Sequence, residues 1–184
     1  MALPWPDHLL SLTDWATLPA DPTRRYELVE GVLLVTPRPA FLHQRAMLRL
    51  GADLDRQLPH RLSVASEVEI VIGAEPTTVR VPDLLIVPTA VADTNPPRVA
   101  AADVLLAVEI TSPGTVRTDR ITKLYEYADA GIPAYWLLDL SGVPTLTAHT
   151  LVDGAYELTR RGSGLLRWNE PAPLAIDVSR LIDR

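Results

Sequence analysis

The sequence predicts an α/β protein, a sandwich that combines a mixed β-sheet with few helices. Two segments, 41–58 and 119–131, carry the apolar spacing or the end signals of helices. Three short apolar runs, 83–87, 104–110 and 134–140, are typical of strands that are buried on both faces. Most of the 17 prolines lie between these segments and mark their ends.

The N-terminal part predicts a short helix followed by a hairpin. In "SLTDWATL", Thr13 suits the N-cap of a helix that ends before Pro19. In "YELVEGVLLV", two strand-like runs flank Glu30-Gly31, which is a typical hairpin turn.

The first long helix is predicted between Phe41 and Leu58, because apolar residues recur at helical spacing up to Pro59. Its apolar stripe consists of Ala46, Met47, Leu50, Leu54 and Leu58. Alternating apolar residues then predict strand structure at Val64, Val68, Ile70 and Ile72. The runs 83–87 and 104–110 follow, and their apolar faces place them in the centre of a sheet.

The second long helix has clear signals at both ends. Thr118 suits its N-cap, and Asp119 favours the positive end of the helix dipole. Gly131 suits the C-terminal end, and Pro133 prevents continuation.

The C-terminal part predicts a strand, a hairpin and one more short element. "AYWLLDL" (134–140) has the pattern of a buried strand, and "TLTAHTLVDGAYELT" that of a hairpin that turns at Asp153-Gly154. The tail "LAIDVSRLID" fits either a short strand or a short helix.

The composition is that of a globular protein, with 47% apolar and 22% charged residues. The length of 184 residues fits one domain, residues 1–184. No window approaches the roughly 18 apolar residues of a membrane span, so we expect no membrane partner. "MALPWPDHLL" lacks the basic and apolar regions of a signal peptide, which predicts a cytoplasmic location.

The absence of cysteine excludes disulfides, thiol catalysis and thiolate metal sites. The four histidines, His8, His43, His60 and His149, lack the spacing of zinc ligands. Any metal is therefore expected to be a hard cation bound by oxygen. The formal charge of −6 disfavours non-specific coating of nucleic acid, but it does not decide the charge of a local cleft.

Two carboxylates lie at the ends of the central strands. Asp83 begins one strand and Glu109 lies near the end of the next, so antiparallel pairing would bring both to one edge of the sheet. Two close carboxylates repel unless a cation lies between them, and oxygen ligands favour Mg²⁺ or Mn²⁺. Alternatively, Asp83 caps a turn after Pro82, and Glu109 pairs with a surface arginine.

The ordered set of motifs resembles the Uma-type family of "putative restriction endonucleases" in the PD-(D/E)XK nuclease superfamily. Pro82-Asp83 resembles the PD element, and Glu109 resembles the second acid. The matching stretches are "YELVEG", His43, "VRVPDLLIV", "LLAVEITSP" and "DRITKLYEYADAGIPAYWLLDL".

The resemblance implies a restriction-endonuclease-like core, in which helices flank a mixed central sheet and hairpins are added at the N-terminal and C-terminal ends. It also implies an endonuclease that hydrolyses the phosphodiester bonds of DNA. Asp83 and Glu109 would hold Mg²⁺ or Mn²⁺, which activates a water.

The lysine expected two residues after the acid is absent, because position 111 is Thr111. The resemblance implies that Lys123, from the following helix, replaces it and orients the water or stabilises developing charge. A helix that begins near Asp119 reaches Lys123 after about one turn, roughly 6 Å, and its side chains lean back toward the N-terminus. The alternative is an i,i+4 pair with Asp119, and Tyr127 on the same face is expected to be a half-buried packing residue.

Two further residues match the family pattern. Glu27 adds a carboxylate near the metal or, alternatively, pairs with an arginine such as Arg25. His43 contacts a phosphate or the attacking water or, alternatively, faces solvent at the start of its helix. Ser112 and Thr115 equally fit a turn.

Basic side chains favour DNA as the partner. Arg45, Arg49 and Arg56 share one side of the first long helix, and Arg117 and Arg120 precede Lys123. The alternative is a solvated helix face, favoured for Arg56 because Asp53 and Asp55 lie beside it.

A homodimer is expected, partly because nucleases of the superfamily often pair to cut both strands and partly because an apolar strand such as 134–140 needs cover. The competing function is a catalytically inactive nuclease-fold protein that acts as a dimerising or nucleic-acid-binding module. The acidic net charge favours that alternative.

Overall fold

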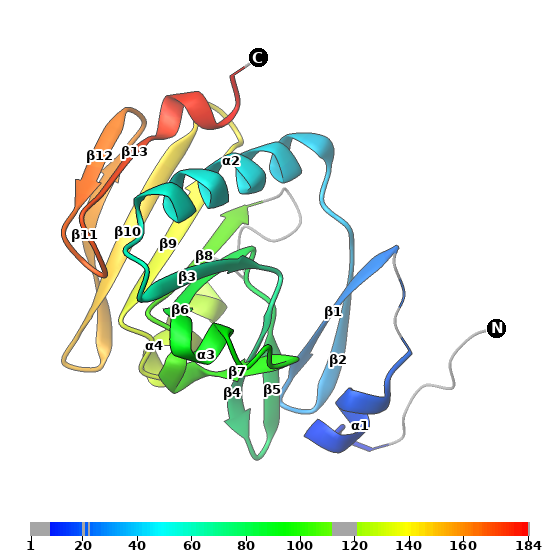
Figure 1. The fold of residues 1–184 in the computed structure, drawn as a ribbon. Coiled ribbons are helices and arrows are strands. Elements are labelled where there is room, and N and C mark those ends of the chain that lie inside the picture. Colours follow the sequence, from blue (N-terminus) through cyan, green and yellow to red (C-terminus); the bar gives the residue numbers. More distant parts are fainter. Residues whose placement is uncertain (1–7, 20, 22, 112–120, 184) are drawn as a thin grey trace.

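The computed structural model describes residues 8–19, 21, 23–111 and 121–183. Two mixed sheets form the body of the molecule, a long helix covers one side, and a two-stranded hairpin lies near the C-terminus (Figure 1). The helices are α1 (Leu12–Thr17), α2 (Phe41–Gln57), α3 (Thr89–Ala92), α4 (Lys123–Asp129) and the short 3₁₀ segments η1 (Ala101–Asp103) and η3 (Val178–Leu181).

The first sheet has the strand order β2-β1-β5-β4-β7. Its strands are β1 (Arg24–Val29), β2 (Val32–Pro37), β4 (Glu69–Ala74), β5 (Thr77–Arg80) and β7 (Arg98–Ala100). The second sheet has the order β11-β10-β9-β8-β6-β3. Its strands are β3 (Leu62–Ser66), β6 (Leu84–Pro88), β8 (Leu106–Thr111), β9 (Ala134–Asp139), β10 (Thr145–Val152) and β11 (Ala155–Gly162). The third sheet pairs β12 (Leu165–Trp168) with β13 (Leu174–Asp177).

The mixed α/β class is confirmed, and the strands outside the C-terminal pair divide between two mixed sheets. The run predicted as strand over 64–72 divides into β3 and β4, which belong to different sheets. Glu67 lies between them with φ of 54°, a left-handed conformation that turns the chain. The alternation of apolar residues continues through this turn, so the sequence pattern did not separate the two strands.

Both hairpin turns are confirmed. Glu30 and Gly31 have φ of 49° and 79°, and Asp153 and Gly154 have φ of 48° and 83°, as a two-residue turn between antiparallel strands requires. Gly31 is also needed for space, because a Cβ there would lie 2.7 Å from the Cβ of Leu9. The tail forms both of its predicted alternatives in turn, the strand β13 and then the 3₁₀ segment η3.

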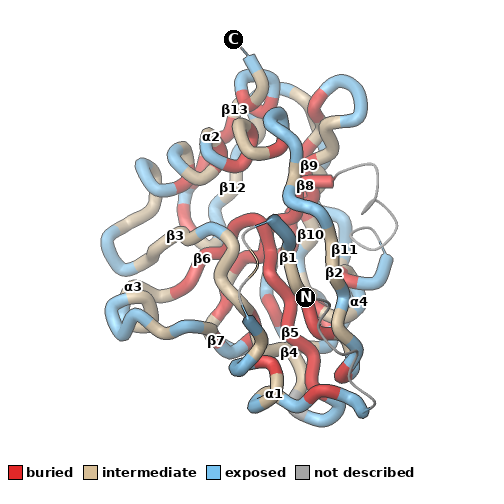
Figure 2. Tube along the Cα trace, turned by 90° about the vertical axis from the view of Figure 1, so that its right-hand side faces the viewer, coloured by how far each residue is buried: buried red, intermediate tan, exposed pale blue. Residues whose placement is uncertain are grey.

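The central strands of the second sheet, β6, β8 and β9, are buried on both faces, as their apolar patterns predicted. Alternate residues of β6 point to opposite sides, so Ile86 packs in one cluster with α2, and Leu85 packs in another with Tyr127 of α4. The strand 134–140 is covered by this chain itself, since Trp136 and Tyr135 belong to these two clusters. Figure 2 shows the buried segments running through the middle of the molecule and the exposed ones around its rim.

Helix boundaries follow the sequence with one error. Helix α2 begins at Phe41 and ends one residue before the predicted end. The N-cap of α1 is Ser11 rather than Thr13, because Ser11 and Asp14 form a reciprocal capping box. Gly131, with φ of 77°, lies just after α4 as predicted. The predicted cap Thr118 lies outside the described residues.

Candidate active site

The pairing of β6 with β8 brings the two predicted carboxylates to the same end of the second sheet. The strands are antiparallel, with Leu84 opposite Val108, so Asp83 and Glu109 occupy the next positions along the two chains. A hydrogen bond of 2.6 Å from the amide of Ile110 to Oδ2 of Asp83 fixes the aspartate against β8. Both carboxylates are buried.

Asp83 has two further partners from elements distant in sequence. Nη1 of Arg25, on β1, lies 2.8 Å from Oδ1 of Asp83, and Nη2 of Arg25 donates to the carbonyl of Val81. Nε2 of His43, in the first turn of α2, lies 3.2 Å from Oδ2 of Asp83. Burial would raise the pKa of Asp83, but the hydrogen bond from His43 and the charge of Arg25 hold it below its ordinary value.

Glu109 is held by the helix that follows it. Nζ of Lys123 lies 2.8 Å from Oε1 of Glu109, and the hydroxyl of Tyr127 donates to the same oxygen at 2.9 Å. Tyr127 is completely buried rather than half-buried, and burial together with the charge of Glu109 raises the pKa of its hydroxyl well above its ordinary value. The helix therefore delivers its ammonium to the strand end, as the predicted geometry required.

Glu27 lies at the junction of the two sheets and binds groups from both sides. Its Oε1 accepts from Nζ of Lys123 at 3.1 Å and from the amide of Val81 at 3.0 Å, and its Oε2 accepts from Nη1 of Arg80 at 3.0 Å. Burial would raise the pKa of Glu27, but the charges of Lys123 and Arg80 lower it. The alternative pairing of Glu27 with Arg25 is replaced by Arg80, because β5 lies beside β1.

Arg80 connects Glu27 to helix α4. Its Nε and Nη2 form a bidentate pair with Glu126 at 2.7 and 2.8 Å, and only 1% of its side chain is exposed. Glu126 lies three residues after Lys123 on the same helix, so this pair also fixes the position of the lysine.

His43 is buried, so the alternative of a solvent-facing histidine is wrong. Its Nε2 lies 2.9 Å from the carbonyl of Ile110, which can only accept, so this nitrogen carries the proton. Its Nδ1 is buried without a hydrogen-bond partner. Helix α2 is thereby connected to both Asp83 and β8 through one imidazole ring.

Two residues of this site, Arg80 and Glu126, were missed in the sequence, and Arg25 was considered only as a partner of Glu27. Both missed residues lie inside motifs that were recognised, Arg80 in "VRVPDLLIV" and Glu126 in "DRITKLYEYADAGIPAYWLLDL". A further unused signal is composition, because Lys123 is the one lysine in a chain with 17 basic residues. Because the other basic residues are arginines, a lysine at position 123 indicates a role for which an ammonium and a guanidinium are not interchangeable.

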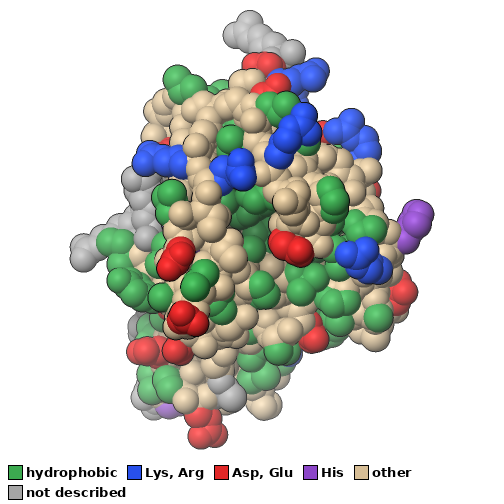
Figure 3. All heavy atoms as spheres, turned by 90° about the vertical axis from the view of Figure 1, so that its left-hand side faces the viewer, with side chains coloured by type: hydrophobic (Ala, Val, Ile, Leu, Met, Phe, Trp, Pro, Cys, Tyr) green, Lys and Arg blue, Asp and Glu red, His purple; other side chains and the backbone are tan. Residues whose placement is uncertain are grey.

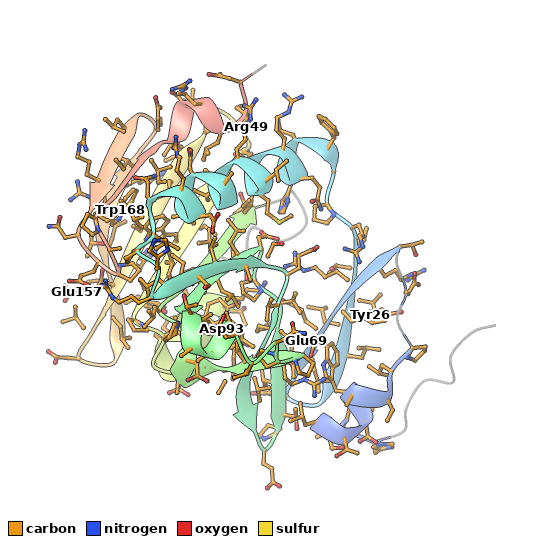
Figure 4. All side chains as sticks on the ribbon, in the orientation of Figure 1. Tyr26, Arg49, Glu69, Asp93, Glu157 and Trp168 are labelled. Atoms are coloured by element: carbon orange, nitrogen blue, oxygen red, sulfur yellow. The ribbon has the colours of Figure 1, made fainter. Side chains whose placement is uncertain are left out.

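The predicted phosphate-binding arginines have mixed outcomes. Arg49, which points from α2 toward the C-terminal segment in Figure 4, donates to the carbonyls of Arg180 and Asp183 at 2.8 and 2.7 Å. Arg45 approaches carbonyls of the same segment at 3.4 and 3.5 Å. Arg56 pairs with Asp53 at 2.6 Å, as the alternative proposed. Ser112, Thr115, Arg117, Arg120 and Asp119 lie outside the described residues.

The ligand atoms that this site offers are oxygens, which are the type that a hard cation prefers. Asp83, Glu109 and the carbonyl of Ile110 offer oxygen at one strand end, and the chain has no thiolate. Within the described ranges, however, no three His, Asp or Glu side chains group closely enough to hold a metal by themselves. Mg²⁺ is commonly held by one or two carboxylates plus water, so Asp83 and Glu109 would be its protein ligands.

The local charge is also compatible with a cation. Four carboxylates, those of Glu27, Asp83, Glu109 and Glu126, meet three cationic side chains, those of Arg25, Arg80 and Lys123. The cluster therefore has one negative charge in excess when His43 is neutral.

The fold with its two mixed sheets, into which this buried cluster of carboxylates and a lysine is built, is also found in a known protein. A solved structure, described as a "putative nuclease belonging to DUF820" from Anabaena variabilis, matches with a TM-score of 0.72 at 18% sequence identity, over 94% of this chain and 97% of that one. The profile of the Uma2 family, described as "Putative restriction endonuclease", matches residues 12–181. The chain belongs to this family. No curated protein matches it.

Proposed function

We propose that the protein is a Mg²⁺- or Mn²⁺-dependent endonuclease that hydrolyses phosphodiester bonds of DNA. The observation that carries the proposal is the convergence of Asp83, Glu109 and Lys123, from three separate elements, at one end of the second sheet. Membership of the family supports the reaction class.

Each residue has a distinct part in this chemistry. The bound metal would lower the pKa of a water and stabilise negative charge on the phosphate. Asp83 and Glu109 would supply its carboxylate ligands, and the 2.8 Å contact between Lys123 and Glu109 keeps an ammonium beside them. Lys123 would orient the attacking water or stabilise the charge that develops on the phosphate oxygens. His43 would position Asp83.

The test is cleavage of plasmid and of single-stranded DNA with Mg²⁺ or Mn²⁺. Glu109→Ala and Lys123→Ala are expected to lose at least about a hundredfold in rate, the usual scale for removing a transition-state contact. Arg98→Ala is the matched control, because Arg98 pairs with Glu69 outside the site and should leave the rate unchanged. Equal cleavage by all four proteins would mean that a contaminant carries the activity.

One observation favours the second candidate, an inactive nuclease-fold binding module. Each of Glu27, Asp83 and Glu109 contacts a cationic side chain of the protein, so the cluster is already largely neutralised without a metal. If purified protein binds DNA but cleaves none with either metal, this candidate replaces the first.

We also propose that the working unit is a homodimer. A hollow of about 680 Å³ lies between α2 and β3, and Phe41 and Leu48 on its rim are 74% and 73% exposed. Figure 3 shows one face of the molecule, where apolar side chains are mixed with acidic ones and basic side chains gather toward the end with the C-terminus. Sedimentation of the wild type and of Leu48→Glu tests the pairing, since a dimer through this surface should become monomeric.

No helix in the described part of the chain has the length and hydropathy that crossing a bilayer requires.

A further inference from the structure

Arg25 pairs with Asp83, one of the two predicted metal ligands. Its Nη1 lies 2.8 Å from Oδ1 of Asp83, and its guanidinium is held in place by the carbonyl of Val81. Because side chains alternate along a strand, Arg25 and Glu27 of β1 project from the same face and approach the site together.

Three of the four carboxylates of the site act electrostatically on the guanidinium. Burial lowers the pKa of Arg25, but the charges of Asp83, Glu109 and Glu27 more than offset this effect, so its pKa lies above the ordinary value. Carboxylates that lie close together repel unless a cation lies between them. The side chain of Arg25 therefore supplies a cation from the protein itself.

A metal ion would compete with Arg25 at one particular atom. Oδ2 of Asp83 is engaged by the amide of Ile110 and by His43, which leaves Oδ1, the atom that Arg25 contacts. A divalent cation held by Asp83 would be repelled by the guanidinium, because like charges close together repel.

Arg25 has space into which it can move. It lines a polar hollow of about 370 Å³ beside β1, together with Trp15, Tyr26, Arg38 and Glu67. Its side chain is 13% exposed, and its buried Nε has no hydrogen-bond partner among the residues that the structure describes, so these contacts do not satisfy the whole guanidinium. Lys123, in contrast, is more deeply buried and contacts two carboxylates at once.

We propose that Arg25 is the resident counter-cation of Asp83, that it competes with the divalent metal for Oδ1, and that it turns into the polar hollow when the metal binds. This inference rests on the proposed metal-dependent function. It makes Arg25 a positioning residue that holds the acidic site together until a metal replaces it.

The test measures Mn²⁺ affinity by calorimetry on protein stripped with chelator, without DNA. Arg25→Gln keeps hydrogen-bonding capacity but removes the charge, and it is expected to bind Mn²⁺ at least about tenfold more tightly than the wild type, since the repulsion is gone. Arg24→Gln is the matched control, because Arg24 is the neighbouring arginine, 60% exposed and paired with Asp21, and its affinity should equal that of the wild type. Adding Asp83→Asn to Arg25→Gln should abolish the gain.

The outcomes separate this inference from the proposed function. Equal or weaker Mn²⁺ binding by Arg25→Gln overturns the inference, even if the wild type cleaves DNA. Tighter binding by Arg25→Gln supports it, even if no variant cleaves DNA and the endonuclease proposal fails. If Arg25→Gln does not fold, Arg25→Met replaces it, because it keeps much of the side-chain length and also removes the charge; unchanged Mn²⁺ affinity in that variant overturns the inference.

Discussion

Two arginines on neighbouring strands each hold a buried carboxylate, and they do so in opposite ways. Arg80 is buried, and three of its nitrogens donate hydrogen bonds to Glu27 and Glu126. Arg25 gives one donor to Asp83 and lies beside an open hollow. The difference indicates that Arg80 is part of the framework that positions Lys123, whereas Arg25 is a cation that another cation can replace.

The comparison predicts its largest effect at Arg80. Arg80→Ala leaves Glu27 and Glu126 without their shared partner, and breaking a buried pair costs about 3 to 5 kcal/mol of unfolding free energy. Urea unfolding would measure this loss. Arg98→Ala, which removes a partly exposed pair with Glu69, should cost about 1 kcal/mol or less. Similar losses of unfolding free energy in the two variants would show that Arg80 stabilises the fold no more than the partly exposed Arg98 does.

A smaller effect is expected at Arg25, and it should depend on metal. Arg25→Ala leaves Asp83 with its contacts to Ile110 and His43, so a loss of about 1 to 3 kcal/mol is expected. Saturating Mn²⁺ should restore about 2.7 kcal/mol at a hundredfold excess over Kd. Thermal unfolding with and without Mn²⁺ checks this. If Mn²⁺ stabilised Arg80→Ala and not Arg25→Ala, the contrast between the two arginines would be wrong.

The hydroxyl of Tyr127, a neutral hydrogen-bond donor to the same cluster, should contribute less to the unfolding free energy than either arginine. Tyr127→Phe removes the hydrogen bond to Glu109 but keeps the ring, which packs 5.4 Å from that of Tyr135. We expect a loss of about 1 kcal/mol, because Lys123 still pairs with Glu109. Chemical unfolding measures it, and a loss as large as that of Arg80→Ala would contradict the assignment.

The last prediction concerns how stability changes with pH, which isolates the contribution of Glu27. The pKa of Glu27 is lowered by folding, so its contribution to stability is fully present above its unfolded pKa of about 4.3 and is lost as the pH falls through the lower folded value. Glu27→Gln should therefore have a flatter unfolding free energy than the wild type below about pH 4.3. Parallel curves for the two proteins, measured by urea unfolding from pH 7 downward, would refute this contribution.

The sequence predicted the parts of the site that depend on local pattern. Asp83 and Glu109 could be placed together because two adjacent apolar strands pair antiparallel. Lys123 was placed beside them by the resemblance to the family, and the reach of a helix from the following segment was compatible with that placement. The roles of these residues in catalysis stay predictions.

The partners of these residues could not be predicted in the same way. Arg25 meets Asp83 across two sheets, and residues 62–74 divide between these sheets as β3 and β4. Arg80 meets Glu27 of the neighbouring strand β1 and Glu126 of α4. The division depends on the left-handed conformation of Glu67, which no hydrophobic period encodes. A charged residue in a strand pattern shows that a partner is needed, but only the tertiary arrangement selects it.

Ile110 has a consequence for how such sites change during evolution. Its amide fixes Asp83 and its carbonyl fixes His43, so two contacts of the cluster belong to peptide groups that every residue type except proline possesses. The side chain at this position can therefore vary among apolar types while the geometry of the acid and the imidazole is inherited. Relatives that share this strand could retain the architecture of the cluster after most recognisable sequence identity has been lost.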